Sequence, residues 1–125
     1  MLFSNNDKVY KNVVIICFKM NLTEKKCKPC EGSVPAMTEA QANELLKQVP
    51  SWKIKDWKVT KEFKFKNFLE AMEFVNKVAE IAEQEQHHPD ISISYSKVSI
   101  ETWTHAINGL SENDFILAAK IDEIQ

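Results

Sequence analysis

All three histidines of this 125-residue chain lie in one short segment, between positions 87 and 105. His87 and His88 are adjacent and precede Pro89, and His105 follows a stretch in which apolar and polar residues alternate. Because the unperturbed pKa of histidine is close to neutral pH, such a cluster is typical of metal binding, proton transfer or a pH-dependent switch. The elements that position the three imidazoles decide among these roles.

Three segments carry apolar residues at helical spacing. The first covers residues 37–49, the second covers residues 67–86, and the third runs from Phe115 onward. Pro89 disfavours helical backbone in the residue before it, so the second helix should end ahead of His88, which we expect to be extended.

The second of these helices has an apolar stripe wider than one face, because Phe74 and Ile81 extend it. Two interpretations remain open. The extra side chains either contact another subunit or cover an edge of the chain's own sheet.

Period-two alternation predicts two pairs of strands. The first pair occupies residues 51–66 and turns near Lys55 and Asp56. The face expected to be apolar on its second strand consists of Trp57, Val59, Phe63 and Phe65. The second pair turns near Ser96. Its alternating series are Ile91, Ile93 and Tyr95 before the turn and Val98, Ile100 and Thr102 after it, and we interpret Tyr95 as a core residue.

The predicted order is therefore helix, two strands, helix, two strands, helix. Strands in consecutive pairs separated by helices indicate an α+β fold, here a four-stranded antiparallel sheet with helices packed on one face. The length suits one domain, which we place at residues 20–125. Residues 1–19 are expected to be an N-terminal extension, either disordered or an artefact of the choice of start. A weak transit peptide is the less favoured interpretation.

Composition and charge exclude several classes of function. The formal net charge of -2, with lysines scattered among glutamates, provides no basic surface for nucleic acid. No apolar run approaches the roughly 18 to 20 residues that span a bilayer, so we expect a cytoplasmic protein without membrane contact. Three cysteines are an odd number, which argues against a disulfide framework. Cys27 and Cys30 have the spacing of half a zinc site or of a redox pair, but we interpret them as a structural or incidental loop pair.

The predicted hairpin brings the histidines together. Because His88 and His105 lie at nearly equal distances on either side of the turn at Ser96, strand pairing places both at the same end of the sheet. A metal site would need further ligands such as Glu83, Asp90 or Asp114, and adjacent histidines in extended backbone point to opposite faces. Metal binding is therefore disfavoured. A structural role remains open, but three histidines meeting at one place favour acid and base catalysis.

The segment EQEQHHPDISISYSKVSIETWTHAINGLSEND resembles the signature of the pterin-4a-carbinolamine dehydratase family. The signature has an acid, three residues, His-His-Pro, five residues, Tyr, nine residues, His, and an Asp a short way on. The positions in register are Glu83, His87, His88, Pro89, Tyr95, His105 and Asp114. The resemblance extends over roughly residues 20–125.

This resemblance implies that the protein dehydrates 4a-hydroxytetrahydropterin to the quinonoid dihydropterin and so supports tetrahydrobiopterin recycling. It places His87 and His105 in proton transfer and His88 in substrate binding, and leaves open which of the first two is acid and which is base. Hydroxide is a poor leaving group, so the reaction requires an acid that protonates the hydroxyl and a base that takes a proton from the ring nitrogen system. It needs neither metal nor cofactor. The resemblance further implies a homodimer or homotetramer and a functional link to an aromatic amino acid hydroxylase.

Three further residues are candidates for substrate binding, each with a structural alternative. Asp114 is a carboxylate near the pocket in the family and also a capping-box partner of Ser111. Glu83 lies one turn before His87 and either orients that imidazole or is a solvated glutamate. Trp103 shares the face of His105 by strand parity and either stacks on a flat pterin or packs on the sheet.

The main alternative to an enzyme is a binding module. Some relatives of this scaffold act as a dimerisation cofactor, an assembly factor or a coactivator, and the helix over residues 67–86 could serve that role. Animal members often carry an aromatic residue in place of Ile91 and an asparagine in place of Ser96, which leaves substrate stacking and the coactivator role open. Nothing in the sequence identifies the pterin side chain, so an intermediate of molybdenum-cofactor synthesis also remains open.

Overall fold

The computed structural model describes residues 21–28 and 35–125. The expectations for residues 1–19 and for Cys30 lie outside this part of the chain. The described elements, in chain order, are η1 (Leu22–Glu24), α2 (Glu39–Leu46), β1 (Lys53–Lys55), β2 (Lys58–Lys64), α3 (Phe68–Glu85), β3 (Asp90–Ser94), β4 (Lys97–Thr102), η2 (His105–Ile107) and α4 (Glu112–Glu123).

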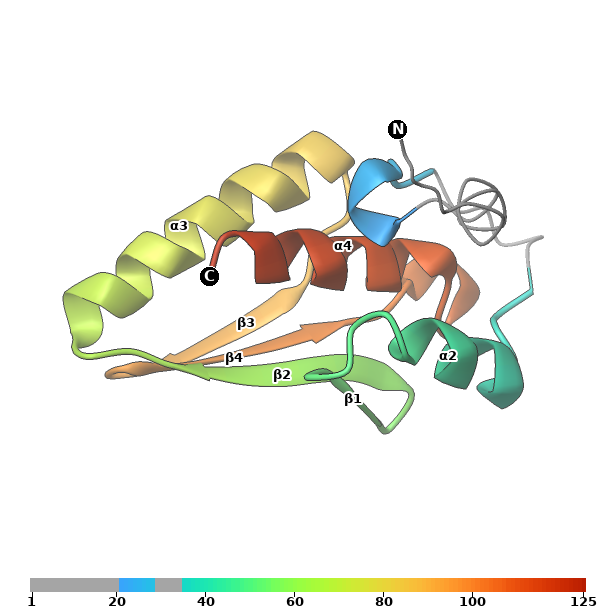
Figure 1. Ribbon diagram of the computed structural model, residues 1–125, viewed down its shortest axis with the longest axis horizontal. Helices are drawn as coiled ribbons and strands as arrows, with labels where there is room; N and C mark the ends of the chain where they lie inside the picture. Colours follow the sequence, from blue (N-terminus) through green and yellow to red (C-terminus); the bar gives the residue numbers. More distant parts are fainter. Residues whose placement is uncertain (1–20, 29–34) are drawn as a thin grey trace, which may run out of the picture.

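The strands form one antiparallel sheet in the order β1-β2-β4-β3, and α3 and α4 lie on the same side of it (Figure 1). The predicted α+β class is thus confirmed. The hairpin of β3 and β4 turns at Tyr95 and Ser96, because Ser94 pairs with Lys97. The start of β3 consequently lies beside the end of β4, where Asp90 pairs with Glu101. This register creates the end of the sheet at which the histidines gather.

The core forms between the inner face of the sheet and the two long helices. Val59 and Phe63 of β2 are buried, as the alternation predicts. Phe74 of α3 is also buried, with its ring centroid 4.7 Å from that of Phe63 and 5.0 Å from that of Phe65. Ile81 is partly buried against the same core. The widened stripe of this helix therefore packs on the chain's own sheet, which is the second of the two interpretations.

Two aromatic residues expected on the apolar faces lie instead in turns. Trp57 is 54% exposed and Tyr95 is 67% exposed, so both predictions were wrong. The reason is local backbone geometry. Asp56 and Trp57 both have positive φ, at 52° and 61°, and form the connection between β1 and β2. Tyr95 likewise has φ of 53° at the β3–β4 turn. Left-handed residues of this kind interrupt the alternation on which the predictions rested.

The described helices include none that is both long enough and apolar enough to span a bilayer.

The buried carboxylate of Glu85 links the segment of residues 25–28 to the helices α3 and α4. Glu85, the last residue of α3, accepts hydrogen bonds from the backbone N–H of Cys27 at 2.8 Å and from Lys120 Nζ at 2.6 Å. Burial by itself would raise the pKa of Glu85, but the hydrogen bonds from Cys27 and Lys120 and the charges of Lys120 and Lys26 outweigh it, so the pKa lies below its usual 4.5. Residues 25–28 are thereby held against the ends of α3 and α4.

Replacing this carboxylate should destabilise the fold at neutral pH. We expect Glu85→Gln to lower the free energy of unfolding at pH 7 by about 2 kcal/mol, because it leaves the partly buried Lys120 without its counter-charge. The lowered folded-state pKa means that the charge stabilises the protein above pH 4.5 and that this stabilisation is lost as the pH falls through the folded value. Urea unfolding at a series of pH values should therefore show the variant and the wild type converging in acid.

The exposed Glu80, five residues earlier on α3, provides the control for this measurement. Glu80→Gln should stay within about 0.5 kcal/mol of the wild type at all pH values. Equal stability of Glu85→Gln and wild type at pH 7 would contradict the role assigned to Glu85.

Candidate active site

The end of α3 aims His87 at the core. Gln86 caps the helix in the left-handed conformation, with φ of 54°, and the backbone N–H of His87 then bonds to the carbonyl of Ala82 at 3.1 Å. This reversal places the His87 ring over α4, where Nε2 lies 2.7 Å from Asp114 Oδ1. The His87 side chain is 11% exposed and that of Asp114 is fully buried.

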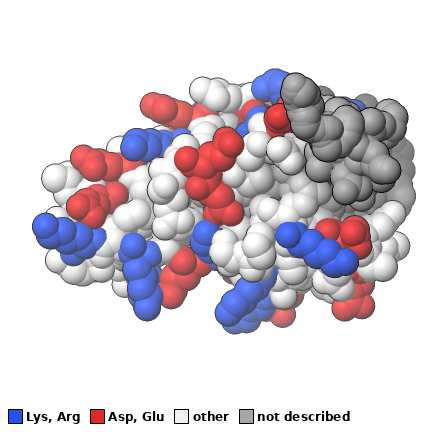
Figure 2. Space-filling model, viewed as in Figure 1, with Lys and Arg blue, Asp and Glu red and all other residues white. Residues whose placement is uncertain are grey.

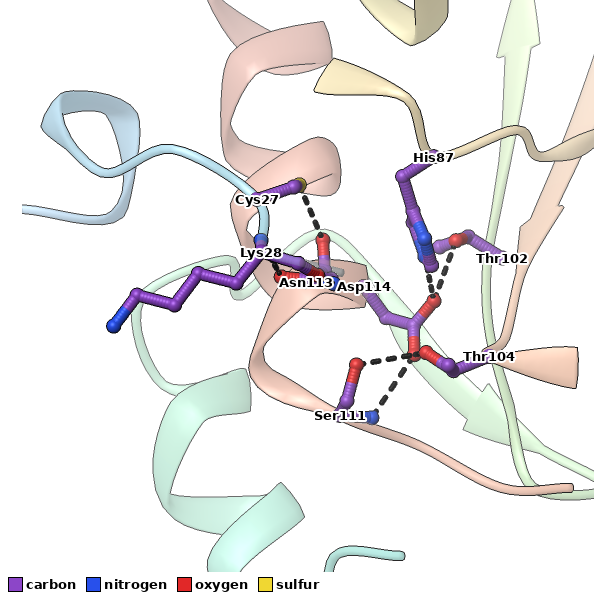
Figure 3. Close-up of polar contacts among 8 residues, drawn as sticks. All are labelled: Cys27, Lys28, His87, Thr102, Thr104, Ser111, Asn113 and Asp114. Carbon is purple, nitrogen blue, oxygen red and sulfur yellow. Dashed lines mark hydrogen bonds and ion pairs between the residues drawn. The ribbon is translucent and has the colours of Figure 1, made fainter. Parts of the chain in front are cut away.

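Asp114 is surrounded by hydrogen-bond donors (Figure 3). It lies in the first turn of α4 and completes a capping box with Ser111, whose backbone N–H donates to Oδ2 at 3.0 Å. Thr102 Oγ1 donates to Oδ1 at 2.7 Å, and Thr104 Oγ1 donates to Oδ2 at 2.9 Å. Asp114 therefore caps α4 and also contacts His87, so the two interpretations of this residue are compatible.

This arrangement determines which nitrogen of His87 carries a proton. An ionised carboxylate only accepts hydrogen bonds, and the hydroxyl and amide donors around Asp114 suit that form. Nε2 of His87 must then donate to Oδ1, which leaves Nδ1 to exchange a proton with a ligand. Among the described residues Nδ1 has no hydrogen-bond partner. A buried carboxylate behind an imidazole is the arrangement that orients a catalytic histidine and stabilises its protonated form.

His87 opens onto a cleft of about 280 Å³ that contains all three histidines. Its lining residues are Lys28, Gln86, His87, His88, Trp103, Thr104, His105, Ala106 and Asn113. A larger hollow of about 490 Å³ lies along α2, but it is lined mainly by apolar and amide side chains with Glu44 as its one titratable group. Because the three histidines line the smaller cleft and imidazoles suit proton transfer near neutral pH, we take this cleft as the candidate site.

His105 and Trp103 also line the cleft. His105 is exposed and begins η2, and its ring centroid lies 4.0 Å from that of Trp103 with the planes inclined by 50°. The structure therefore brings the two together, although β4 ends at Thr102 and strand parity is not the cause. The indole Nε1 of Trp103 is buried and has no hydrogen-bond partner within the described chain. On the outer side, Lys58 Nζ lies 5.6 Å from the Trp103 ring centroid.

Glu83 contacts a different histidine from the one considered in the sequence analysis. Its Oε2 lies 2.6 Å from His88 Nε2, and both side chains are exposed. The left-handed cap at Gln86 explains the change, because it directs His87 inward and leaves His88 beside the last turn of α3. Orientation of His87 by Glu83 is thus incorrect, and Asp114 has that position instead.

Two residues of the site were not predicted from the sequence. Thr102 and Thr104 are both buried, and both donate to Asp114. The one available signal was a hydroxyl at Thr102, on the face of β4 that also carries the buried Val98 and Ile100. A polar group in a buried series requires a partner, but the alternation could not name it.

Cys27 lies near the site but does not line the cleft. Its backbone is bound by Glu85, and its Sγ lies 3.6 Å from the carbonyl oxygen of Asn113. Burial, followed by the charge of Glu85, raises the pKa of the thiol to about 12. A thiol in this state is a poor nucleophile and metal ligand near neutral pH. Within residues 21–28 and 35–125 no group of three His, Cys, Asp or Glu side chains is arranged to hold a metal ion.

The fold and the site together describe an α+β domain with a buried His–Asp pair at one end of an antiparallel sheet. Comparison with known proteins shows the family to which this chain belongs. The family model described as pterin 4 alpha carbinolamine dehydratase matches residues 35–124. The chain therefore belongs to the pterin-4a-carbinolamine dehydratase family, a family of hydro-lyases.

Individual relatives agree with this assignment. A Methylococcus capsulatus protein named "Putative pterin-4-alpha-carbinolamine dehydratase" is 50% identical over 106 residues, which cover 83% of this chain and 93% of the relative. A Nitrosospira multiformis protein of the same name is 49% identical over 104 residues, covering 83% and 92%. The crystal structure of a transcriptional coactivator/pterin dehydratase from Brucella melitensis matches with a TM-score of 0.68 and 35% identity, covering 71% of this chain and 97% of that one.

Proposed function

We propose that the protein dehydrates a 4a-hydroxytetrahydropterin to the quinonoid dihydropterin, with His87 and His105 moving the protons. The observation that carries the proposal is the buried Asp114–His87 pair, which opens onto the same cleft as His105. Family membership supplies the substrate class. Both proton-transfer residues that the resemblance implies therefore line the same cleft.

The reaction removes one molecule of water from the substrate. The hydroxyl at C4a takes up a proton and leaves as water, the C4a–O bond breaks, and N5 gives up its proton as the C4a=N5 double bond forms. We assign the base to His87, because Asp114 fixes its Nε2–H and stabilises the imidazolium that forms when Nδ1 accepts a proton. His105 has no such carboxylate among its described contacts and is assigned the acid.

The remaining residues of the cleft suit substrate binding. The Trp103 ring provides a flat apolar surface beside His105, and aromatic surfaces of this kind stack on flat heterocycles. The exposed His88–Glu83 pair offers both a donor and an acceptor at the rim, which match the amide and amidine edge of a pterin. We propose that these residues determine affinity and that His87 and His105 determine the rate of the chemical step.

The biological setting is part of the same proposal. A cytoplasmic role in tetrahydrobiopterin recycling follows from the substrate, and the class of enzyme that must supply it is an aromatic amino acid hydroxylase. A homodimer or homotetramer is supported by the one-sided pairing of β3 and by Phe68 and Leu69 of α3, which are 50% and 68% exposed. These exposed residues also favour the second candidate function, a binding scaffold.

The test is the rate at which 4a-hydroxytetrahydropterin, generated in situ, loses water in the presence of the purified protein. We expect a clear acceleration over buffer that saturates with substrate. Circular dichroism of the same sample provides the control for folding. A correctly folded protein that is no faster than buffer would refute the dehydratase proposal for this pterin and leave the exposed start of α3 as the surface to examine for a partner.

A further inference from the structure

Thr102 is a buried polar residue that takes no direct part in the proposed proton transfers. It is the last residue of β4, it is fully buried, and it pairs across the sheet with Val59. On the same face of β4 the preceding buried residues, Val98 and Ile100, are apolar. A buried hydroxyl lowers the stability of the fold unless it forms a hydrogen bond. Here Thr102 Oγ1 donates to Asp114 Oδ1 at 2.7 Å.

The oxygen that Thr102 contacts is the one that His87 uses. Oδ1 of Asp114 accepts from Thr102 Oγ1 at 2.7 Å and from His87 Nε2 at 2.7 Å. A carboxylate oxygen presents two lone-pair directions, so a donor fixed at one of them directs the other. Thr102 is well suited to this because its β-branched side chain has few χ1 rotamers and its backbone is held by the sheet.

Thr104 does not duplicate this contact. Its hydroxyl donates to the other oxygen, Oδ2, at 2.9 Å and also lies 2.7 Å from Ser111 Oγ. Oδ2 further receives the backbone N–H of Ser111. The contacts at Oδ2 thus belong to the cap of α4, whereas Thr102 is the protein's second donor at the oxygen facing His87 (Figure 3).

We propose that Thr102 is a positioning residue: its hydroxyl holds Oδ1 of Asp114 in the orientation that keeps the proton of His87 on Nε2 and leaves Nδ1 open to the substrate. The consequence for the rate rests on the proposed function. The consequence for the His87 tautomer does not, because it concerns the free protein.

The experiment compares Thr102→Val, which removes the hydroxyl at nearly constant shape, with Thr102→Ser, which retains it. Thr60→Val is the matched control. It makes the same chemical change on β2, but on the face of the sheet opposite to that of Thr102. Two quantities are measured on each protein. These are kcat and KM for pterin dehydration, and the ¹⁵N chemical shifts of the His87 ring nitrogens, which report the tautomer.

We expect Thr102→Val to lower kcat about tenfold, the size expected for the loss of one hydrogen bond to a charged group, with KM within about twofold of wild type. Thr102→Ser and Thr60→Val should keep kcat within about twofold. The wild-type spectrum should show His87 with its proton on Nε2, and Thr102→Val should show a mixture of tautomers.

Other outcomes overturn the inference. An unchanged kcat in Thr102→Val would do so, and so would a fall in kcat with the His87 tautomer unaltered, because Thr102 would then act by another route. If Thr102→Val does not fold, Thr102→Cys, whose thiol is a weak donor, takes its place with the same criteria. If the wild type lacks dehydratase activity, the proposed function fails, and the ¹⁵N shifts still decide whether Thr102 sets the tautomer.

Discussion

His87→Ala should lower kcat for pterin dehydration by about 10²-fold or more, because it removes the imidazole that accepts the substrate proton. His105→Ala should cause a loss of similar size, since the hydroxyl at C4a would have to leave without a positioned acid. The measurement is the steady-state rate with 4a-hydroxytetrahydropterin generated in situ. Both variants should fold, because His105 is exposed and because Asp114 keeps its hydrogen bonds from residues 102, 104 and 111 when His87 is removed.

His88→Ala is the matched comparison for these two variants. It removes the neighbouring imidazole, which is exposed and pairs with Glu83 instead of Asp114. We expect its main effect to be a raised KM with a smaller change in kcat, as for a residue that binds substrate and transition state alike. A full kcat in His87→Ala, or a larger loss of kcat in His88→Ala than in His87→Ala, would show that the roles of the two histidines are assigned wrongly.

The position of the histidines was predictable because it depends on long-range regularities. The alternation on either side of Ser96 fixes a hairpin, and the antiparallel register then brings the residues before β3 close to those after β4. Pro89 supplies the end of α3 independently. These features involve many residues each, so single exceptions such as Tyr95 do not disturb them.

The contacts within the site were less predictable, because each depends on one or two backbone angles. The left-handed Gln86 turns His87 toward Asp114 and leaves Glu83 to contact His88, and no pattern in the sequence indicates that a glutamine will adopt this conformation. Thr102 illustrates a second limit. Its burial follows from alternation, whereas its bond to Asp114 requires the packing of α4 on the sheet, which residue spacing does not specify.

Asp114→Asn is expected to lower kcat about 10³-fold while the protein remains folded. The asparagine side chain has one oxygen and one NH₂ group, whereas Asp114 accepts hydrogen bonds at both of its oxygens. If the NH₂ group faces His87, Nε2 must become the acceptor and the proton moves to Nδ1, so the ring no longer offers a base to the substrate. If the NH₂ group faces Ser111 and Thr104, the capping box of α4 loses its acceptor.

Either orientation leaves buried donors unpaired, so the free energy of unfolding should also fall, by about 2 kcal/mol. Steady-state rates and urea unfolding measure the two effects separately. Asp90→Asn is the control, because Asp90 is exposed at the start of β3 and does not line the cleft. A variant at Asp114 that loses stability but retains its rate would reduce that carboxylate to a helix cap. The contact between Asp114 and His87 would then be incidental, and the assignment of His87 as the base would lose its structural support.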